Sequence, residues 1–296
     1  MGGMGLFTFR RQQQDPPATP PPGSQKAPES PAPAQPPTSR TVLRQAELDI
    51  ILEDLQAGAA CQRALLPPGP PAVPGYDFGV WCRPARALSG DFHDFLPFQG
   101  SRLPIVVADA SGKGVPAALM AAIGQVLFRV QPEPSASPAR VLSIVNQMIS
   151  GNIKRGTFIS GIYAVLDTAQ HVLHLANAGH LPAVIWHSRE KVATTHRTSG
   201  AVLGVLPSEA YDAEIKEESL ALKPGDRFLL FTDGMNEAMA PGQKEFGMEH
   251  LRLRLKNESD GPSADFLRSL TEQIEMHRGG GEQSDDITLI TARRIP

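Results

Sequence analysis

Hydrophobic and polar residues alternate along much of the chain after Tyr76, as they do in β-strands with one buried face. Segments with this texture cover 76–83, 91–98, 103–109, 157–167, 171–179, 182–187, 226–233 and 286–293. Many neighbouring strands are joined by loops too short for a helical crossover, which favours antiparallel sheets. Helical patterns are predicted at 115–130, 138–150, 247–256 and 263–277. The chain is therefore predicted to be an α+β domain in which helices pack on antiparallel sheets.

The helix predicted at 115–130 has Pro116 in its first turn, where proline is well accommodated. Its larger apolar residues fall on one face, which an amphipathic helix normally turns toward the core. These residues are Leu119, Ala122, Ile123, Val126, Leu127 and Val130.

A further helix is predicted over about 41–66, before the break in "LLPPGPPAVPG". Its apolar seam has the 4-3-4-3-4 spacing of a coiled coil and consists of Leu48, Leu52, Leu55, Ala59, Gln62 and Leu66. Fewer than three heptads also fit one amphipathic helix packed on its own domain. The helix is thus a linker that mediates homodimerisation or activator docking, or a packed element of the domain.

Residues 12–40 contain ten of the 28 prolines and no aromatic residue. Such a composition cannot bury a core and predicts disorder. The sequence is therefore divided into a disordered Pro-rich tail (1–40), a helical linker (41–67) and a folded domain (72–296).

The bulk composition excludes several classes of protein. The net charge of −3 does not indicate a nucleic-acid partner or a membrane surface. The two cysteines, Cys61 and Cys82, match no metal spacing or disulfide framework, which fits a reducing, cytoplasmic setting. No apolar run approaches the ~20 residues of a membrane span, and the N-terminus does not resemble a signal peptide.

The segment "VVADASGKGVPAALMAA" (106–122) superficially resembles a phosphate-binding loop. The P-loop pattern requires an earlier glycine and a Ser or Thr after the lysine, but Gly114 follows Lys113 here. The unusual residue is Asp109, a carboxylate at the end of an apolar strand.

Hairpin geometry gathers carboxylates near Asp109. If 99–102 forms the turn, Asp91 falls opposite Ala110, within a residue or two of Asp109. Asp233 ends another strand, and Asp285 with Asp286 begins the last one. If these strands belong to the same antiparallel sheet, all of the carboxylates share one edge.

Such a cluster is strongly repulsive unless a divalent cation neutralises it. Oxygen ligands favour Mg²⁺ or Mn²⁺, and two such ions can bridge a hydroxide and hold a phosphoryl group for in-line attack. Taken singly, each aspartate is an ordinary strand-end or turn residue; the coincidence of four favours a site.

These motifs resemble the SpoIIE-type bacterial serine/threonine phosphatases, the short branch of the metal-dependent type 2C phosphatases (PPM superfamily) that includes RsbU-like regulators. The matching segments, in order, are "CQRALLP", "SGDFHDF", "ADASGKGVPAALMA", "NAGHLPAVIW", "LKPGDRFLLFTDGMNEAM" and "EQSDDITLITAR". The resemblance covers about residues 45–296.

The resemblance implies an αββα sandwich of two antiparallel sheets flanked by helices. It also implies that two Mg²⁺ or Mn²⁺ ions are held by Asp91, Asp109, Asp233 and Asp285, with the backbone carbonyl of Ala110. By the same resemblance, metal-bound hydroxide attacks phosphorus directly, and the substrate is a phosphorylated regulator such as an anti-sigma-factor antagonist.

The remaining residues near the motifs keep alternative roles. Lys113 is either a contact for substrate phosphate or a solvated loop residue. His180 is interpreted as structural rather than as an acid, and Glu237 could steady the segment after Asp233. Asp94 and Asp286 are either additional metal-site groups or turn caps. A non-catalytic docking module and a metal nuclease are the competing functions; the absence of a basic, aromatic-rich stripe disfavours the nuclease.

Overall fold

The computed structural model describes residues 39–133, 135–154 and 156–295. The chain divides into two compact units, residues 1–46 and Glu47–Pro296, and the second contains the fold described below. The tail predicted at 1–40 lies outside the described residues except for its last two positions. None of the helices in the described part of the chain combines the length and apolar character needed to cross a membrane.

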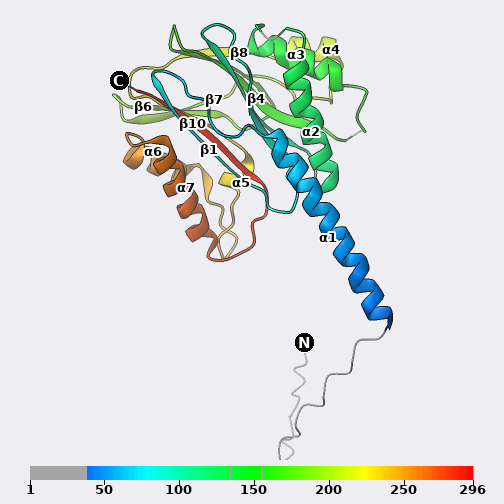
Figure 1. Ribbon diagram of the computed structural model, residues 1–296. Coiled ribbons are helices and arrows are strands. Elements are labelled where there is room, and N and C mark those ends of the chain that lie inside the picture. Colours follow the sequence, from blue (N-terminus) through cyan, green and yellow to red (C-terminus); the bar gives the residue numbers. More distant parts are fainter. Residues whose placement is uncertain (1–38, 134, 155, 296) are drawn as a thin grey trace, which may run out of the picture. The chain divides into compact units, whose positions relative to one another are not determined.

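Two five-stranded antiparallel sheets stack on each other (Figure 1). The first has the order β1-β10-β9-β6-β7, with β1 (Tyr76–Arg83), β10 (Ile287–Arg294), β9 (Arg227–Phe231), β6 (Ala183–His187) and β7 (Val192–His196). The second has the order β2-β3-β4-β5-β8, with β2 (Asp91–Phe95), β3 (Arg102–Ala110), β4 (Ile159–Asp167), β5 (Val172–Ala178) and β8 (Glu217–Ala221).

Helices cover the outer face of each sheet. The second sheet is covered by α2 (Val115–Val130), α3 (Pro138–Ile149) and α4 (Ser208–Glu214). The first is covered by α5 (Asp233–Asn236), α6 (Gly247–Glu258) and α7 (Ser263–Arg278). The predicted αββα sandwich is confirmed.

Strand alternation divides the core into layers. Ile105 and Val107 of β3 pack between the sheets with Phe228 of β9, whereas Val106 faces the helices of the second sheet. Odd-numbered positions of β3 and even-numbered positions of β9 therefore point into the space between the sheets. This parity decides where the carboxylates at the strand ends point.

The predicted buried face of α2 is wrong. Leu119, Ile123, Val126 and Val130 are exposed, while the residues packed on the sheet include Ala121 and Gly124. A Cβ on Gly124 would lie 2.7 Å from Ile159 Cδ1, so only small residues let the helix approach the sheet so closely.

Helix α1 (Ser39–Leu65) occupies the predicted linker region. Ala59 in its C-terminal half is buried, but Leu48 and Leu52 are more than half exposed. Packing within the domain therefore accounts for only part of the predicted seam.

The predicted register of the first hairpin is wrong by one residue. Asp91 pairs with Asp109, and Gln99 bridges Arg102, so the 96–98 segment contains one residue more than the strand opposite it. Pro97 lies in this segment and has no N–H to donate to a regular ladder.

Candidate metal centre

The candidate ligands come from both sheets, and the expectation that they share one sheet is wrong. Asp91 and Asp109 lie at one end of β2 and β3, whereas Asp233 follows β9 and Asp285 precedes β10. Stacking brings these strand ends together, because Asp91 and Asp109 have the parity that points between the sheets.

A hydrogen bond from Thr232 to Asp91 joins the two sheets at this point. The Thr232 hydroxyl donates to Asp91 Oδ2 over 2.6 Å and accepts the N–H of Thr288 over 2.9 Å. The Asp91 N–H donates to Ser89 Oγ over 3.0 Å. Asp91 of β2 is thereby held in a buried position against the end of β9.

Burial and mutual repulsion raise the pKa values of this cluster. Burial, then the charges of Asp233 and Asp285, raises the pKa of Asp109 to about 7, and Lys113 opposes this shift. Burial and Asp109 also raise the pKa of Asp91, and burial with Asp285 raises that of Asp233. The cluster therefore has more negative charge than its surroundings neutralise.

A divalent cation fits this donor set, because it would relieve the repulsion and oxygen donors suit Mg²⁺ or Mn²⁺. Within the described residues, no three His, Cys, Asp or Glu side chains already converge as a coordination shell.

Two glycines allow close approach of the backbone around these carboxylates. The Ala110 N–H donates to the Gly90 carbonyl over 3.0 Å, and a Cβ on Gly90 would lie 3.0 Å from the Ala110 oxygen. A Cβ on Gly234 would lie 2.1 Å from the Asp286 oxygen. Side chains at these two positions would displace the segments that present Asp109 and Asp233.

Lys113 is partly exposed and pairs with one of the candidate ligands. Its Nζ lies 2.9 Å from Asp285 Oδ2 and donates to the Ser284 carbonyl over 2.8 Å. It therefore connects the glycine loop after Asp109 to the loop that presents Asp285.

Asp286 and Asp94 hold neighbouring elements in place. Asp286 accepts the N–H groups of Ala85 and Gly90 over 2.7 and 2.6 Å, which fixes the loop before Asp91. Asp94 points to the helix side of its sheet and pairs with Arg129 of α2 over 2.6 Å. Asp286 therefore caps the backbone turn before Asp91, and Asp94 contacts α2 on the face of its sheet that lies away from the cluster.

His180 uses both ring nitrogens within the protein. Nδ1 lies 2.8 Å from Ser160 Oγ, and Nε2 lies 3.1 Å from the Phe231 carbonyl. Burial lowers its pKa to about 4, which keeps the ring neutral. These contacts support the structural interpretation. Glu237 is exposed, and its backbone N–H donates to the Asp233 carbonyl over 2.9 Å.

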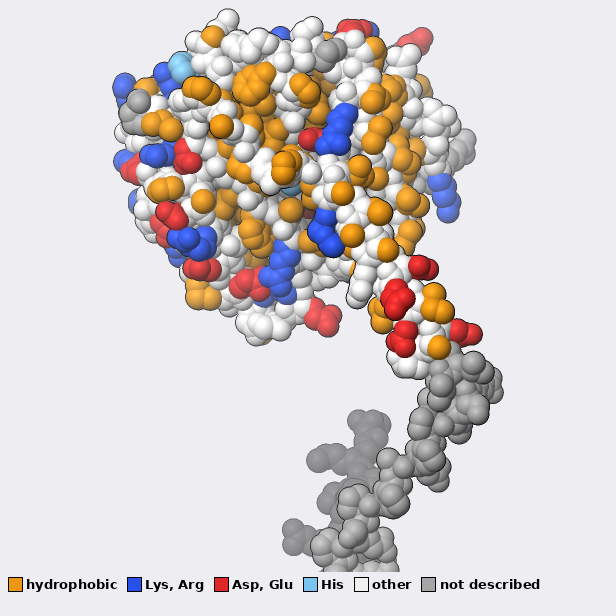
Figure 2. All heavy atoms as spheres, in the orientation of Figure 1, with side chains coloured by type: hydrophobic (Ala, Val, Ile, Leu, Met, Phe, Trp, Pro, Cys, Tyr) orange, Lys and Arg blue, Asp and Glu red, His pale blue; other side chains and the backbone are white. Residues whose placement is uncertain are grey.

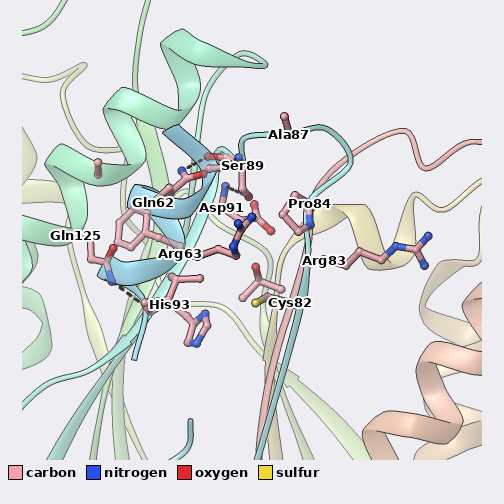
Figure 3. A pocket seen from close by; sticks show the side chains of 15 residues that line it. Gln62, Arg63, Cys82, Arg83, Pro84, Ala87, Ser89, Asp91, His93 and Gln125 are labelled. Atoms are coloured by element: carbon pink, nitrogen blue, oxygen red, sulfur yellow. Dashed lines mark hydrogen bonds between the residues drawn. The ribbon is translucent and has the colours of Figure 1, made fainter. Parts of the chain in front are cut away.

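A contact between α1 and this centre was not predicted from the sequence. The Gln62 side chain donates to the Ser89 carbonyl over 2.6 Å and accepts the Ser89 N–H over 2.9 Å (Figure 3). Ser89 precedes Asp91 by two residues, so α1 is attached to the segment that presents a candidate ligand. A polar residue in an otherwise apolar seam was the available signal.

Comparison with known proteins identifies the family. Residues 99–295 match the model of the family described as Stage II sporulation protein E (SpoIIE). The chain is similar to the phosphoserine phosphatase RsbU of Bacillus subtilis (strain 168), with 31% identity over 251 residues that cover 82% of this chain and 71% of RsbU.

Solved structures agree with this result. The SiaA-PP2C domain of Pseudomonas aeruginosa superposes with a TM-score of 0.72 at 22% identity, covering 84% of this chain and 98% of that domain. The RsbU and RsbW domains of Rv1364c from Mycobacterium tuberculosis give a TM-score of 0.63 at 26% identity, covering 78% of this chain and 64% of that one. The chain therefore belongs to the SpoIIE family and is an RsbU-like phosphatase with the type 2C fold.

Proposed function

We propose that this chain removes phosphoryl groups from phosphoserine or phosphothreonine in a partner protein, with two Mg²⁺ or Mn²⁺ ions as cofactors. The observation that carries the proposal is the cluster of carboxylates from both sheets, whose pKa values are raised by burial and mutual repulsion. The similarity to RsbU, a phosphoserine phosphatase by name, supports the reaction class.

Asp91, Asp109, Asp233 and Asp285 would hold the ions, with the Ala110 carbonyl as a further donor. When bound, the ions would supply Lewis-acid activation of a water and charge neutralisation for phosphoryl oxygens. The Thr232 hydroxyl keeps Asp91 oriented, and Lys113 keeps Asp285 beside the glycine loop. The hydrolysis we propose is direct, without a phospho-enzyme, and the lack of a Cys-x5-Arg sequence disfavours a cysteinyl-phosphate route.

The substrate we propose is a phosphorylated regulator protein in the cytoplasm, such as an anti-sigma-factor antagonist in a partner-switching pathway. The similarity to RsbU supports this choice. The free cysteines, Cys61 and Cys82, are both exposed and fit a reducing compartment.

Hydrolysis of a small aryl phosphate with Mn²⁺, and again after chelation, tests the chemistry. Activity that requires the metal supports the proposal. No activity with either Mn²⁺ or Mg²⁺ favours a docking module. A survey of phosphopeptides then tests the substrate class, which a preference for phosphotyrosine or nucleotides would refute. An Asp109→Asn variant used as a trap, followed by phosphosite mapping, identifies the partner.

We also propose that the chain forms a homodimer through helix 41–66. Leu48 and Leu52 of α1 are exposed, and hydrophobic side chains gather over α1 and α2 on one face (Figure 2). An apolar groove between these helices is lined by Ile51, Leu55, Val115 and Leu119. A second copy of the linker would cover these surfaces.

A further inference from the structure

A hollow opens beside the carboxylate cluster, between the segments 83–86 and 282–284. The two segments are joined by Gln283, whose Nε2 donates to the Arg83 carbonyl over 2.8 Å and to the Asp285 carbonyl over 2.7 Å. Asp286 holds the other side by accepting the Ala85 N–H over 2.7 Å. The walls of the hollow are therefore fixed to the same backbone that presents Asp285.

Arg86 stands where this hollow meets the candidate metal centre. Its side chain lines the hollow and is exposed. Its Nη1 would lie 4.0 Å from a Cβ placed on Gly114, so the guanidinium reaches the glycine loop that follows Asp109. Among the described residues its side chain has no hydrogen-bond or ion-pair partner.

The other charged groups of the hollow are largely paired. Arg83 lies 2.6 Å and Arg278 lies 2.9 Å from the same oxygen of Glu275, so one carboxylate serves two arginines. Figure 3 shows Arg83 pointing away from Asp91. Glu282 is exposed on the rim. The positive charges therefore outnumber the negative ones by three (Arg83, Arg86 and Arg278) to two (Glu275 and Glu282). Of these arginines, Arg86 is the one available to an incoming anion.

We propose that this hollow binds an acidic side chain of the protein substrate, close to its phosphorylated residue, through Arg86. The inference rests on the proposed function and narrows the substrate to a phosphoserine or phosphothreonine within an acidic segment. A guanidinium binds a carboxylate through two parallel hydrogen bonds, which suits recognition of Asp or Glu. Because the Arg86 guanidinium reaches the glycine loop that follows Asp109, such a residue would lie close to the phosphoryl group.

Phosphoserine peptides that differ only in having Glu, Gln or Lys at each neighbouring position in turn provide the test. The kcat/KM values are compared for the wild type, Arg86→Gln and Arg86→Glu. The matched control is Arg189→Gln, an exposed arginine after β6, at the end of the first sheet opposite to Asp233.

At one position the wild type should prefer Glu to Gln by roughly two- to fivefold, as expected for one exposed charge pair. Arg86→Gln should lose this preference, Arg86→Glu should prefer Lys, and Arg189→Gln should behave as the wild type. A reversed preference in Arg86→Glu would establish the contact, since general damage to the enzyme cannot reverse it.

Aryl phosphate hydrolysis separates the two hypotheses. If the wild type hydrolyses the aryl phosphate but the Arg86 variants keep the Glu preference, this inference is wrong and the proposed function stands. If the Arg86 variants lose activity on every peptide and on the aryl phosphate by the same factor, Arg86 contacts the phosphoryl group, which also overturns the inference. If the wild type hydrolyses neither class of substrate, the proposed function fails and this inference with it.

Discussion

Asp91 and Asp109 stand directly opposite each other on the antiparallel strands β2 and β3. Like charges at such a cross-strand pair destabilise a sheet. Here both carboxylates point between the sheets and the pKa of each is raised. The carboxylates at these strand ends therefore repel each other, and a bound cation would relieve this repulsion.

Replacement of Asp109 by Asn should have opposite effects on function and on stability. We expect Asp109→Asn to weaken Mn²⁺ binding and slow hydrolysis by orders of magnitude, because a ligand charge is lost. The metal-free variant should melt at a higher temperature than the wild type, because one like charge leaves the cluster. Calorimetric Mn²⁺ titration and melting curves measure the two effects.

Asp94→Asn is the matched control, since Asp94 lies on the adjacent strand β2 but pairs with Arg129 on the other face of the sheet. It should lower stability and leave Mn²⁺ affinity intact. Undiminished Mn²⁺ binding in both Asp109→Asn and Asp233→Asn would overturn the assignment of the metal centre.

The metal-free protein should lose stability as the pH rises. The pKa of Asp109 is raised to about 7 in the folded state, whereas an aspartate in an unfolded chain has a pKa of about 3.9. Between these values the folded state binds more protons than the unfolded state, so the free energy of unfolding falls with increasing pH. The pKa values of Asp91 and Asp233 are also raised in the folded state.

Melting temperatures measured in chelator across this pH window, for the wild type and Asp109→Asn, isolate the effect. The advantage of the variant should grow with pH up to about pH 7 and then level off. An advantage that is constant with pH would show that Asp109 titrates normally in the folded protein.

The contact between Gln62 and Ser89 should couple α1 to the metal centre. Gln62→Leu removes two hydrogen bonds and should lower Mn²⁺ affinity and hydrolysis, because the backbone before Asp91 loses its support. Gln56→Leu, at an exposed position of the same helix, is the control. Equal Mn²⁺ titrations for the two variants would mean that α1 only packs against this segment.

The exposed part of the α1 seam should mediate self-association. Leu48→Glu combined with Leu52→Glu should reduce the mass in solution measured by light scattering, because both side chains are exposed and available to a second copy. Leu253→Glu, an exposed leucine on α6, should leave the mass unchanged. A wild-type chain that is monomeric over the concentration range tested would refute the homodimer.

The local pattern of apolar and polar residues was sufficient to predict the strands that present the candidate ligands. The strands β3, β4, β9 and β10 are rich in apolar residues, which are buried on both faces of their sheets. An aspartate lies at or next to one end of each of these apolar runs. The strands β7 and β8 and the helices α4 and α5 were not predicted. The strands are short and half-exposed, so their apolar signal is weak, and each of the two helices is at most seven residues long.

Tertiary structure decided how these parts meet. Which sheet each aspartate belongs to depends on strand pairings between residues far apart in sequence, such as β10 with both β1 and β9. The pairing of Asp91 with Asp109 depends on one extra residue near Pro97, and the buried face of α2 depends on close approach to Ile159. Sequence by itself determined which residues bear the charges and end the strands, because those properties are local. Their convergence required the stacking of two sheets, which no local pattern encodes.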